Sequence, residues 1–255
     1  MYGHDLRMHR LFPEPGRRLF SVPLDHSVTL GPIEGLESTA ATARELQEGG
    51  ADLLIVAKGA VRDVVPVLSP PTLLGIHLSA STALGDRADR KVLVGSAAEA
   101  SALGADLVSV QVNFGVPDEP EMLRDLGGMV DQCRAAGLPL LVMAYVKGRA
   151  TPGEAEIRHA ARAAADLGAD LVKTSYPGTP EAFQRLVAST PVPVLLGGGV
   201  RLDDEAAALG LIRTVVDGGG AGICIGRNLF QRPPLVPFAQ KVARILHGEP
   251  RPNAR

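Results

Sequence analysis

The sequence predicts an α/β fold built as a single closed (β/α)8 barrel, the TIM-barrel architecture. Eight short apolar runs alternate with longer amphipathic segments along 255 residues, close to the length of about 250 that is typical of such a barrel. No long polar linker divides this alternation, which favours a closed barrel over an open doubly wound sheet. Four segments repeat one pattern, a glycine that ends a helix just before the next strand: EGGADLL (48–54), ALGADLV (102–108), DLGADLV (166–172) and DGGGAGI (217–223).

The strands are predicted where a short apolar run is bounded by charged or turn residues. In chain order they are RLFSVPLD (18–25), DLLIVA (52–57), TLLGIHL (72–78), DLVSVQV (106–112), PLLVMAY (139–145), DLVKT (170–174), VPVLLG (192–197) and AGICIG (221–226). Most of these runs are nearly continuous in Val, Leu and Ile. This is expected of parallel strands that are buried on both faces.

Helices are predicted where the sequence between the strands becomes amphipathic. They are expected at 36–48, 96–103, 119–136, 153–167, 179–188, 203–217 and 235–247. The charged residues of 153–167 are expected to form a solvated helix face. Residues 79–95 break the pattern because they lack a clean helix, and we expect a long loop with an extra short strand there.

The whole chain is expected to be one domain, 1–255, with an N-terminal extension at 1–14 and a C-terminal tail at 249–255. A formal charge of −2 argues against a nucleic-acid partner. The N-terminus lacks the apolar core of a signal peptide, and no run approaches the ~18 apolar residues of a membrane span. Cys133 and Cys224 are expected to be reduced packing residues. We therefore expect a soluble, cytoplasmic protein without a membrane partner.

The chemistry of a (β/α)8 barrel lies at the C-terminal ends of its strands. In this sequence those ends are unusually polar for positions beside a hydrophobic core. They carry Asp25, His26, Lys58, His77, Gln111, Asn113, Tyr145, Lys147, Lys173, the triplet Gly197–Gly199 and the sequence Gly226-Arg227-Asn228. The candidate site residues come from this set.

Lys173 stands in the apolar strand DLVKT, where an unpaired ammonium group is costly to bury. It could extend out of the barrel mouth and pair with Asp25. Alternatively, it could form a Schiff base with a carbonyl substrate. Burial and a nearby cation such as Lys147 would lower the pKa of Lys173 and supply the neutral amine that attacks a ketone.

Tyr145 ends the strand before that of Lys173, so the two side chains could face each other and share a proton. A tyrosine at a strand end can also be purely structural. Asp25, in VPLDHS, could orient the lysine, bind substrate hydroxyls or assist dehydration, or it could simply cap a turn. His26 beside it is a further candidate for the site.

Two glycine-rich segments near the C-terminus indicate a phosphate site. In VPVLLGGGV, Gly198 and Gly199 follow a strand and let backbone N–H groups converge on an oxyanion. In GICIGRNLF, Gly226 ends the last strand, and Arg227 and a helix start follow it. Two such loops after the last two strands are typical of phosphate binding in barrels, although glycine-rich turns without a ligand remain an alternative.

Other kinds of site find little support. The glycines are not spaced as G-x-G-x-x-G and no Walker lysine follows them, which excludes dinucleotide and P-loop sites. The six histidines show no H-x-H or H-E-x-x-H pairing, so a metal-dependent enzyme is not expected. We expect neither a metal nor another cofactor.

The chain resembles the class I, Schiff-base aldolases of the archaeal fructose-bisphosphate aldolase and 2-amino-3,7-dideoxyhept-6-ulosonate synthase type, within the DeoC/FbaB-like superfamily. The resemblance covers about residues 15–248. It rests on VPLDHSVTLGPIEGL, IHLSASTAL, KVLVGSAAEASALGADLVSVQVNFG, LLVMAYVKG, ADLVKTSYPG, VLLGGG and GICIGRNLFQ, which occur in the family's order.

The resemblance implies that Lys173 forms the Schiff base, Tyr145 transfers the proton and Asp25 assists. Gly198, Gly199, Gly226 and Arg227 would hold the substrate phosphate, with His26, Lys147 and Ser79 as further substrate-binding groups. It also implies a homo-oligomer, with a decamer as a frequent size. The chain has Ser27 where the family usually has Gly, and YVKG where it usually has YPRG. Both differences lie where the second substrate should bind.

PLDHSVTLGPIEGL and KVLVGSAAEA resemble the heptulosonate synthase branch more closely. That branch joins a keto phosphate to aspartate semialdehyde, and a similar enzyme of secondary metabolism uses dihydroxyacetone phosphate. Lys147, Arg149 and Lys58 are candidates for binding the carboxylate of the acceptor. The alternatives are fructose-1,6-bisphosphate aldolase, a non-catalytic phosphate-binding barrel, and a barrel isomerase or synthase that uses acid/base residues only.

Overall fold

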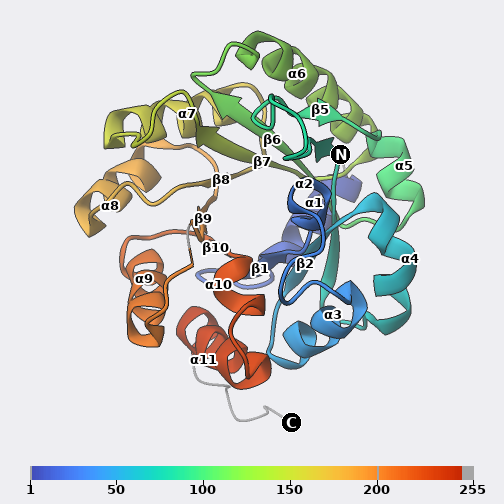
Figure 1. The fold of residues 1–255 in the computed structure, drawn as a ribbon, viewed down its shortest axis with the longest axis vertical. Coiled ribbons are helices and arrows are strands. Elements are labelled where there is room, and N and C mark those ends of the chain that lie inside the picture. The colour runs from blue at the N-terminus through green and yellow to red at the C-terminus, as the bar shows by residue number, and fades with distance from the viewer. Residues whose placement is uncertain (1, 200, 249–255) are drawn as a thin grey trace.

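A computed structural model describes residues 2–199 and 201–248, and the predicted tail at 249–255 lies outside the described residues. Eight parallel strands form a closed barrel in the order β1-β10-β9-β8-β7-β6-β3-β2. Figure 1 shows the helices arranged around these strands. The strands are β1 (Leu19–Pro23), β2 (Leu53–Ala57), β3 (Leu73–His77), β6 (Leu107–Phe114), β7 (Leu140–Val146), β8 (Leu171–Thr174), β9 (Val194–Gly197) and β10 (Gly222–Cys224). The predicted fold class and its eight strands are confirmed.

The helices of the outer layer also follow the prediction. They are α3 (Thr39–Glu48), α5 (Ala97–Ala102), α6 (Glu119–Ala136), α7 (Glu154–Asp166), α8 (Pro180–Ser189), α9 (Glu205–Asp217) and α11 (Leu235–His247). Of the shorter helices only the start of α10 after Gly226 was predicted, because single turns carry too little periodicity to be recognised. They are α2 (Ser27–Leu30), α4 (Val61–Val64), α10 (Arg227–Phe230) and the 3₁₀ turns η1 (Lys58–Ala60) and η2 (Val65–Val67).

Residues 79–95 form an insertion between β3 and β6 that contains a small antiparallel pair, β4 (Ser79–Ala80) and β5 (Val92–Leu93). The predicted long loop is therefore present, with two short strands instead of one. Its tip is tied to the barrel, since the side-chain amide of the buried Asn113 donates to the backbone carbonyl of Asp89 at 2.6 Å. Arg87 also pairs with Asp118 at the start of α6.

The repeated GAD triplet joins neighbouring strands at the N-terminal end of the barrel. Asp52, Asp106 and Asp170 each precede a strand, and one oxygen of each accepts a hydrogen bond from a backbone N–H of the strand beside it. The donors are Phe20 at 2.8 Å, Leu74 at 3.1 Å and Leu140 at 2.8 Å, respectively. The glycine two residues before each aspartate has a positive φ angle, as the left-handed helix end requires.

The segment expected to be an N-terminal extension contains a helix, α1 (Tyr2–Leu11), which was not predicted. His4 and Arg10 each lie 3.0 Å from the second carboxylate oxygen of a GAD aspartate, Asp170 and Asp106 respectively. Leu11 is buried against the apolar side chains that fill the barrel interior. Therefore α1 closes the end of the barrel opposite the strand ends that carry the candidate site.

Two apolar clusters stabilise this arrangement. One lies between the barrel and its helices, and the other fills the barrel interior and includes Leu53, Met143 and Cys224. Cys133 and Cys224 are both free and buried, as expected of packing residues. Among the described residues, no helix is long and apolar enough to cross a membrane.

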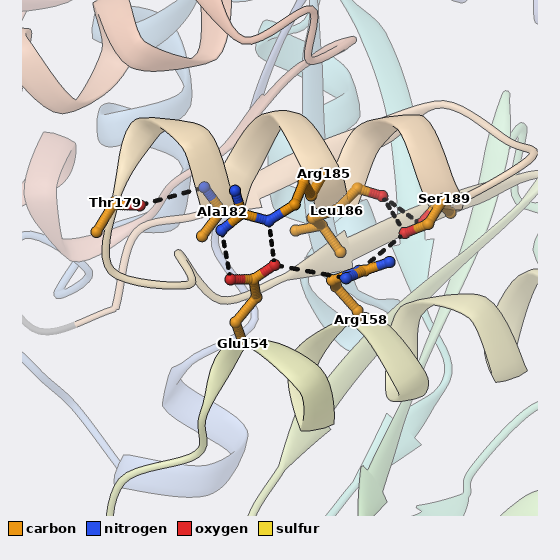
Figure 2. A network of polar contacts seen from close by, with 8 residues as sticks. Glu154, Arg158, Thr179, Ala182, Arg185, Leu186 and Ser189 are labelled. Atoms are coloured by element: carbon orange, nitrogen blue, oxygen red, sulfur yellow. Dashed lines mark hydrogen bonds and ion pairs between the residues drawn. The ribbon is translucent and has the colours of Figure 1, made fainter.

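The charged face of α7 pairs with the neighbouring helix α8 (Figure 2). Arg185 donates two hydrogen bonds of 2.7 Å to the carboxylate of Glu154, and Arg158 adds a longer contact of 3.5 Å to the same group. The hydroxyl of Thr179 caps the start of α8 by accepting a hydrogen bond from the backbone N–H of Ala182. This network is partly solvated, as expected for 153–167, and it lies outside the candidate site.

Candidate active site

A cavity of about 640 Å³ opens at the C-terminal ends of the strands. This volume lies within the range of about 300–1,000 Å³ that is common for ligand sites. Ten of the candidates from the sequence line it: Asp25, His26, Ser79, Tyr145, Lys147, Lys173, Gly198, Gly199, Gly226 and Arg227. Residues from most of the strand ends thus meet in one space, although their roles stay predictions.

Lys173 lies on β8 with only 6% of its surface exposed. Its Nζ atom is 3.6 Å from the sulfur of Met143 and 5.9 Å from the ring centre of Tyr145. Gly197 makes room for this pair, because a Cβ atom there would lie 3.1 Å from the Tyr145 hydroxyl and 3.5 Å from Cε of Lys173. The amine of Lys173 and the phenol of Tyr145 therefore lie next to the backbone of Gly197, which has no side chain.

The charge state of Lys173 differs from the one that the sequence predicts. Burial by itself lowers the pKa of Lys173, but Cys224, Tyr145 and Asp25 outweigh burial, so the net pKa is raised. This direction is opposite to the lowered pKa that the sequence predicts for Lys173. Burial raises the pKa of the Tyr145 phenol and of the Cys224 thiol, so neither is ionised at neutral pH. The anion that faces the Lys173 ammonium at neutral pH is thus Asp25.

Asp25 is positioned by the loop after β1, three places around the barrel from β8. Burial would raise the pKa of its carboxyl, but the nearby His77, His26 and Lys173 outweigh burial and lower it. Asp25 is consequently a carboxylate at neutral pH. No direct ion pair between Asp25 and Lys173 occurs within 4 Å in the described structure, so the two groups can each approach a substrate atom placed between them.

His77 ends β3 and completes the surroundings of Asp25. Its Nε2 atom lies 3.6 Å from Oδ2 of Asp25, and its Nδ1 atom is hydrogen-bonded to the hydroxyl of the buried Ser109 at 2.7 Å. Burial lowers the pKa of His77, which keeps the imidazole neutral at neutral pH. His77 was expected at a strand end, without an assigned role. The structure adds it to the site as a fixed neighbour of Asp25.

His26 lies on the other side of Asp25, with its Nδ1 atom 3.9 Å from Oδ1. Burial lowers the pKa of His26 to about 4, so the ring is neutral at physiological pH. The ring packs edge-on against Phe230, with 5.3 Å between ring centres. Gly226 provides the space for it, since a Cβ atom at that position would lie 2.5 Å from Cε1 of His26.

The two glycine loops meet at the side of the cavity formed by β9 and β10. The guanidinium of Arg227 donates to the carbonyl of Gly199 at 3.1 Å, and the side-chain amide of Asn228 donates to the carbonyl of Gly198 at 2.9 Å. A Cβ atom at Gly198 would lie 2.7 Å from the side chain of Ile225, so the close approach of these loops requires glycine. The loops and one cation together form the wall of the cavity that the sequence predicts to bind phosphate.

The other predicted cations divide into two groups. Lys147 and Arg149 line the cavity, and Arg149 also pairs with Glu156 at 2.7 Å. Lys58 does not line it, because its ammonium pairs with Glu99 at 3.0 Å outside the site. Lys58 is therefore wrong as a candidate for the acceptor. Ser79 is present at the cavity wall, where its hydroxyl oxygen accepts a hydrogen bond from the backbone N–H of Gln111.

Sequence reasoning missed Asp89 and Lys91, which also line the cavity. They lie in the insertion at 79–95, where no strand or helix pattern marks a site. Their only signal was an acid and a base close together in a loop that follows a barrel strand. Within the described residues, no group of three or more His, Cys, Asp or Glu side chains could hold a metal ion.

Comparison with known proteins places this geometry in context. Residues 19–232 match the sequence pattern described as DeoC/LacD family aldolase. The chain is 38% identical over 250 residues to 2-amino-4,5-dihydroxy-6-oxo-7-(phosphonooxy)heptanoate synthase of Streptomyces griseus, covering 97% of this chain and 91% of that protein. It is 35% identical over 257 residues to 2-amino-3,7-dideoxy-D-threo-hept-6-ulosonate synthase of Halobacterium salinarum, covering 99% and 94%.

One solved structure bears on the chemistry. It is an archaeal fructose-1,6-bisphosphate aldolase whose catalytic lysine is covalently bound to the carbinolamine intermediate of the substrate. Its TM-score to this chain is 0.86 at 26% sequence identity, and the alignment covers 96% of this chain and all of the other. A relative of the same fold therefore forms a covalent bond between a lysine and its substrate.

Proposed function

The chain belongs to the DeoC/LacD family of aldolases, and we propose that it is a class I aldolase that works through a Schiff base on Lys173 without a metal. The proposed donor is dihydroxyacetone phosphate and the proposed acceptor is L-aspartate 4-semialdehyde. The product is then 2-amino-4,5-dihydroxy-6-oxo-7-phosphooxyheptanoate, the compound named in the Streptomyces griseus relative. The single observation that carries this proposal is the buried amine of Lys173 beside the phenol of Tyr145 in a large polar cavity.

The first half of the proposed mechanism forms the enamine. Asp25 accepts a proton from the Lys173 ammonium, and the free amine adds to the ketone carbon to give a carbinolamine. The phenol of Tyr145 then protonates the leaving hydroxyl, and water departs to leave an iminium beside a phenolate. The phenolate takes a proton from the adjacent carbon, which regenerates the phenol and gives the enamine.

The second half forms the carbon–carbon bond. The enamine carbon attacks the aldehyde carbon, and Tyr145 gives its proton to the aldehyde oxygen as that bond forms. Water then adds to the new iminium and gives a proton to the Tyr145 phenolate. The resulting carbinolamine collapses to the product ketone and the Lys173 amine, which takes back the proton held by Asp25. One phenol can serve each proton transfer because it lies beside the nitrogen throughout this sequence.

The wall of Gly198, Gly199 and Arg227 is the proposed site of the donor phosphate. Its support is the junction of the two glycine loops with a cation at the end of the cavity that β9 and β10 form. Phosphate sites in barrels commonly occupy the corresponding loops. Binding there would place the donor carbonyl toward the strand β8 that carries Lys173.

The decisive experiment is reduction with borohydride in the presence of dihydroxyacetone phosphate, followed by peptide mapping. The expected result is a mass adduct on Lys173 in the wild-type protein and no adduct in Lys173→Ala. Phosphate-ester binding without any adduct would instead indicate a non-catalytic barrel. Continued exchange of the substrate α-proton by Lys173→Ala would indicate an acid/base enzyme.

The acceptor is identified by a second step of the same experiment. The enzyme is incubated with dihydroxyacetone phosphate and one aldehyde at a time, and the products are identified by mass spectrometry. Consumption of aspartate 4-semialdehyde supports the proposed reaction. Consumption of glyceraldehyde 3-phosphate alone would instead assign fructose-1,6-bisphosphate aldolase, the activity of the structural relative.

We also propose that the enzyme is a cytoplasmic homo-oligomer, with a decamer as the expected size. This follows from the resemblance of its motifs to those of class I aldolases. Light scattering coupled to gel filtration measures the mass in solution directly. A mass of 26.6 kDa, that of one chain, would contradict the oligomer.

A further inference from the structure

We propose that Asp89 and Lys91 recognise the α-amino acid group of the acceptor aldehyde, with Lys91 binding its carboxylate and Asp89 its ammonium. This inference rests on the proposed function, because it assigns the acceptor end of the same cavity. It extends that function by naming two residues that select a zwitterionic aldehyde over a sugar phosphate.

The order of the strands places these residues across the barrel from the phosphate wall. Asp89 and Lys91 belong to the insertion that follows β3, whereas Gly198 and Gly199 follow β9. In the closed ring, β3 and β9 are four strands apart in either direction, so they stand opposite each other. A donor with its phosphate at β9 and its carbonyl at Lys173 leaves the β3 side of the cavity for the second substrate.

Lys91 is a half-buried cation without an acidic partner. Its ammonium donates to the hydroxyl of Ser81 at 2.6 Å and to the hydroxyl of Thr29 at 3.3 Å. In the described ranges, 2–199 and 201–248, no carboxylate lies within 4 Å of it. Two neutral hydroxyls fix the position of the charge without cancelling it, which leaves the ammonium available to an incoming anion.

The electrostatic surroundings of Lys91 agree with this. Burial lowers its pKa, and Lys147 acts in the same direction, against the raising effect of Asp25 and Asp89. Lys147 also lines the cavity, so a second cation stands near the first. A bound carboxylate would relieve both the burial of the Lys91 charge and its repulsion by Lys147.

Asp89 supplies the opposite charge two residues away. Asp89 is an exposed residue that lines the cavity, and it makes no ion pair with any described residue, including Lys91. Its backbone is held in place, because Asn113 donates to the Asp89 carbonyl and accepts in turn from the side chain of Gln111 at 2.8 Å. The backbone that carries this carboxylate is thus anchored two residues from the cation, while the carboxylate itself forms no ion pair with a described residue.

Adjacent, unpaired charges of opposite sign complement a zwitterion. The α-carbon of an amino acid carries an ammonium and a carboxylate side by side, and each would find its counter-charge here. A phosphorylated aldehyde carries negative charge only, so Asp89 would repel it while Lys91 attracts it. Discrimination of this kind uses an unfavourable contact as well as a favourable one.

Two aldehydes that differ in one group test the assignment. Succinate semialdehyde has the carboxylate of aspartate 4-semialdehyde and lacks its amino group. Asp89→Asn is expected to lower kcat/KM for aspartate 4-semialdehyde by about ten- to hundredfold, as for loss of a charged hydrogen bond, and to leave succinate semialdehyde unchanged or improved. Lys91→Gln is expected to impair both aldehydes, and Lys91→Arg, which keeps the cation, is expected to restore part of the loss.

The matched control is Lys58→Gln, a lysine near the same mouth that pairs with Glu99 outside the cavity. It is expected to leave the preference between the two aldehydes unchanged. The inference is overturned if Asp89→Asn impairs both aldehydes equally, or if Lys91→Gln impairs neither. It is also overturned if the wild-type enzyme uses only glyceraldehyde 3-phosphate.

Borohydride trapping of the dihydroxyacetone phosphate imine separates the two levels of the proposal. If Lys173 forms the adduct but Asp89→Asn and Lys91→Gln leave the aldehyde preference unaltered, only the proposed acceptor site is contradicted. Absence of the adduct in the wild-type enzyme would instead contradict the proposed Schiff-base function.

Discussion

The Nζ atom of Lys173 lies 5.9 Å from the ring centre of Tyr145, on the neighbouring strands β8 and β7. Both groups hold their protons at neutral pH, because the pKa of each is raised. The resting site therefore contains an ammonium, a phenol and, on the far side of the substrate space, the carboxylate of Asp25. Lys173 must lose a proton before it can attack the donor ketone, so the rate of imine formation should depend on pH.

Imine formation is expected to accelerate as the pH rises through the neutral range. The raised pKa of Lys173 keeps the reactive amine a minor species, whose fraction grows about tenfold per pH unit below that pKa. Asp25→Asn removes the anion that faces the ammonium, so the pKa of Lys173 falls and the profile moves to lower pH, even if the maximal rate drops. The measurement is the rate of borohydride-trapped adduct between pH 6 and pH 10. An unmoved profile in Asp25→Asn would contradict this role of the carboxylate.

Tyr145→Phe is expected to separate imine chemistry from proton transfer. The variant keeps the ring that packs beside Lys173 and loses the hydroxyl, so turnover should fall by about 10²- to 10⁴-fold, the usual contribution of a general acid or base. The adduct of Lys173 with donor should still form after longer incubation. Exchange of the donor α-proton with deuterated water, followed by NMR, reports the missing step. Wild-type exchange rates in this variant would remove Tyr145 from the mechanism.

Arg227→Gln is expected to weaken binding of the donor phosphate more than it slows the chemical steps. Loss of one charged hydrogen bond to the phosphate predicts an increase in the donor KM of about ten- to hundredfold with a smaller change in kcat. Arg213→Gln on α9 is the matched control, since Arg213 is an exposed arginine away from the cavity. Steady-state kinetics at saturating acceptor gives both parameters. Equal donor KM values in the two variants would place the phosphate elsewhere.

Asp52→Asn is expected to destabilise the fold in a pH-dependent way. Burial would raise the pKa of Asp52, but His247, the backbone N–H of Phe20 and Arg17 outweigh burial and lower it. A lowered folded pKa adds stability that is present above the unfolded value of about 3.9 and is lost as the pH falls through the folded value. The substitution is therefore expected to cost about 1–3 kcal/mol at pH 7 and progressively less toward pH 3.

Urea unfolding at several pH values measures this cost. Asp63→Asn, at an exposed position with a long contact of 3.8 Å to Arg62, is the control and is expected to change little. A pH-independent difference between Asp52→Asn and wild type would show that the charge of Asp52 does not contribute.

Several features of the site were predictable because they are local. A buried strand that contains a lysine, a neighbouring strand with a tyrosine near its end and two consecutive glycine loops can each be identified within a few residues. The barrel rule then assigns them to one end of the fold. For this reason the candidate lysine, tyrosine, aspartate and glycine loops all line one cavity.

Other features were not predictable because they depend on contacts between distant segments. Lys58 directly follows β2 and Lys91 lies in the insertion after β3. Lys58 pairs with Glu99 on α5, whereas Lys91 lines the cavity and donates to the hydroxyls of Ser81 and Thr29. The local sequence does not reveal these partners. The direction of the Lys173 pKa was missed for the same reason, since the groups that raise it, Cys224, Tyr145 and Asp25, come from three separate parts of the chain.

The sequence by itself determined the alternation of strands and helices, the closed barrel and the end of it where polar groups gather. These follow from hydrophobic periodicity, glycine helix ends and chain length, which act over short stretches of chain. Only the tertiary structure decided which charges stand opposite one another across the barrel, and therefore which cation is free and which amine is protonated. The reason is physical. Hydrophobic periodicity and helix ends depend on residues that are close together in the sequence. Electrostatic interactions depend on distances between side chains that are set only when the barrel closes.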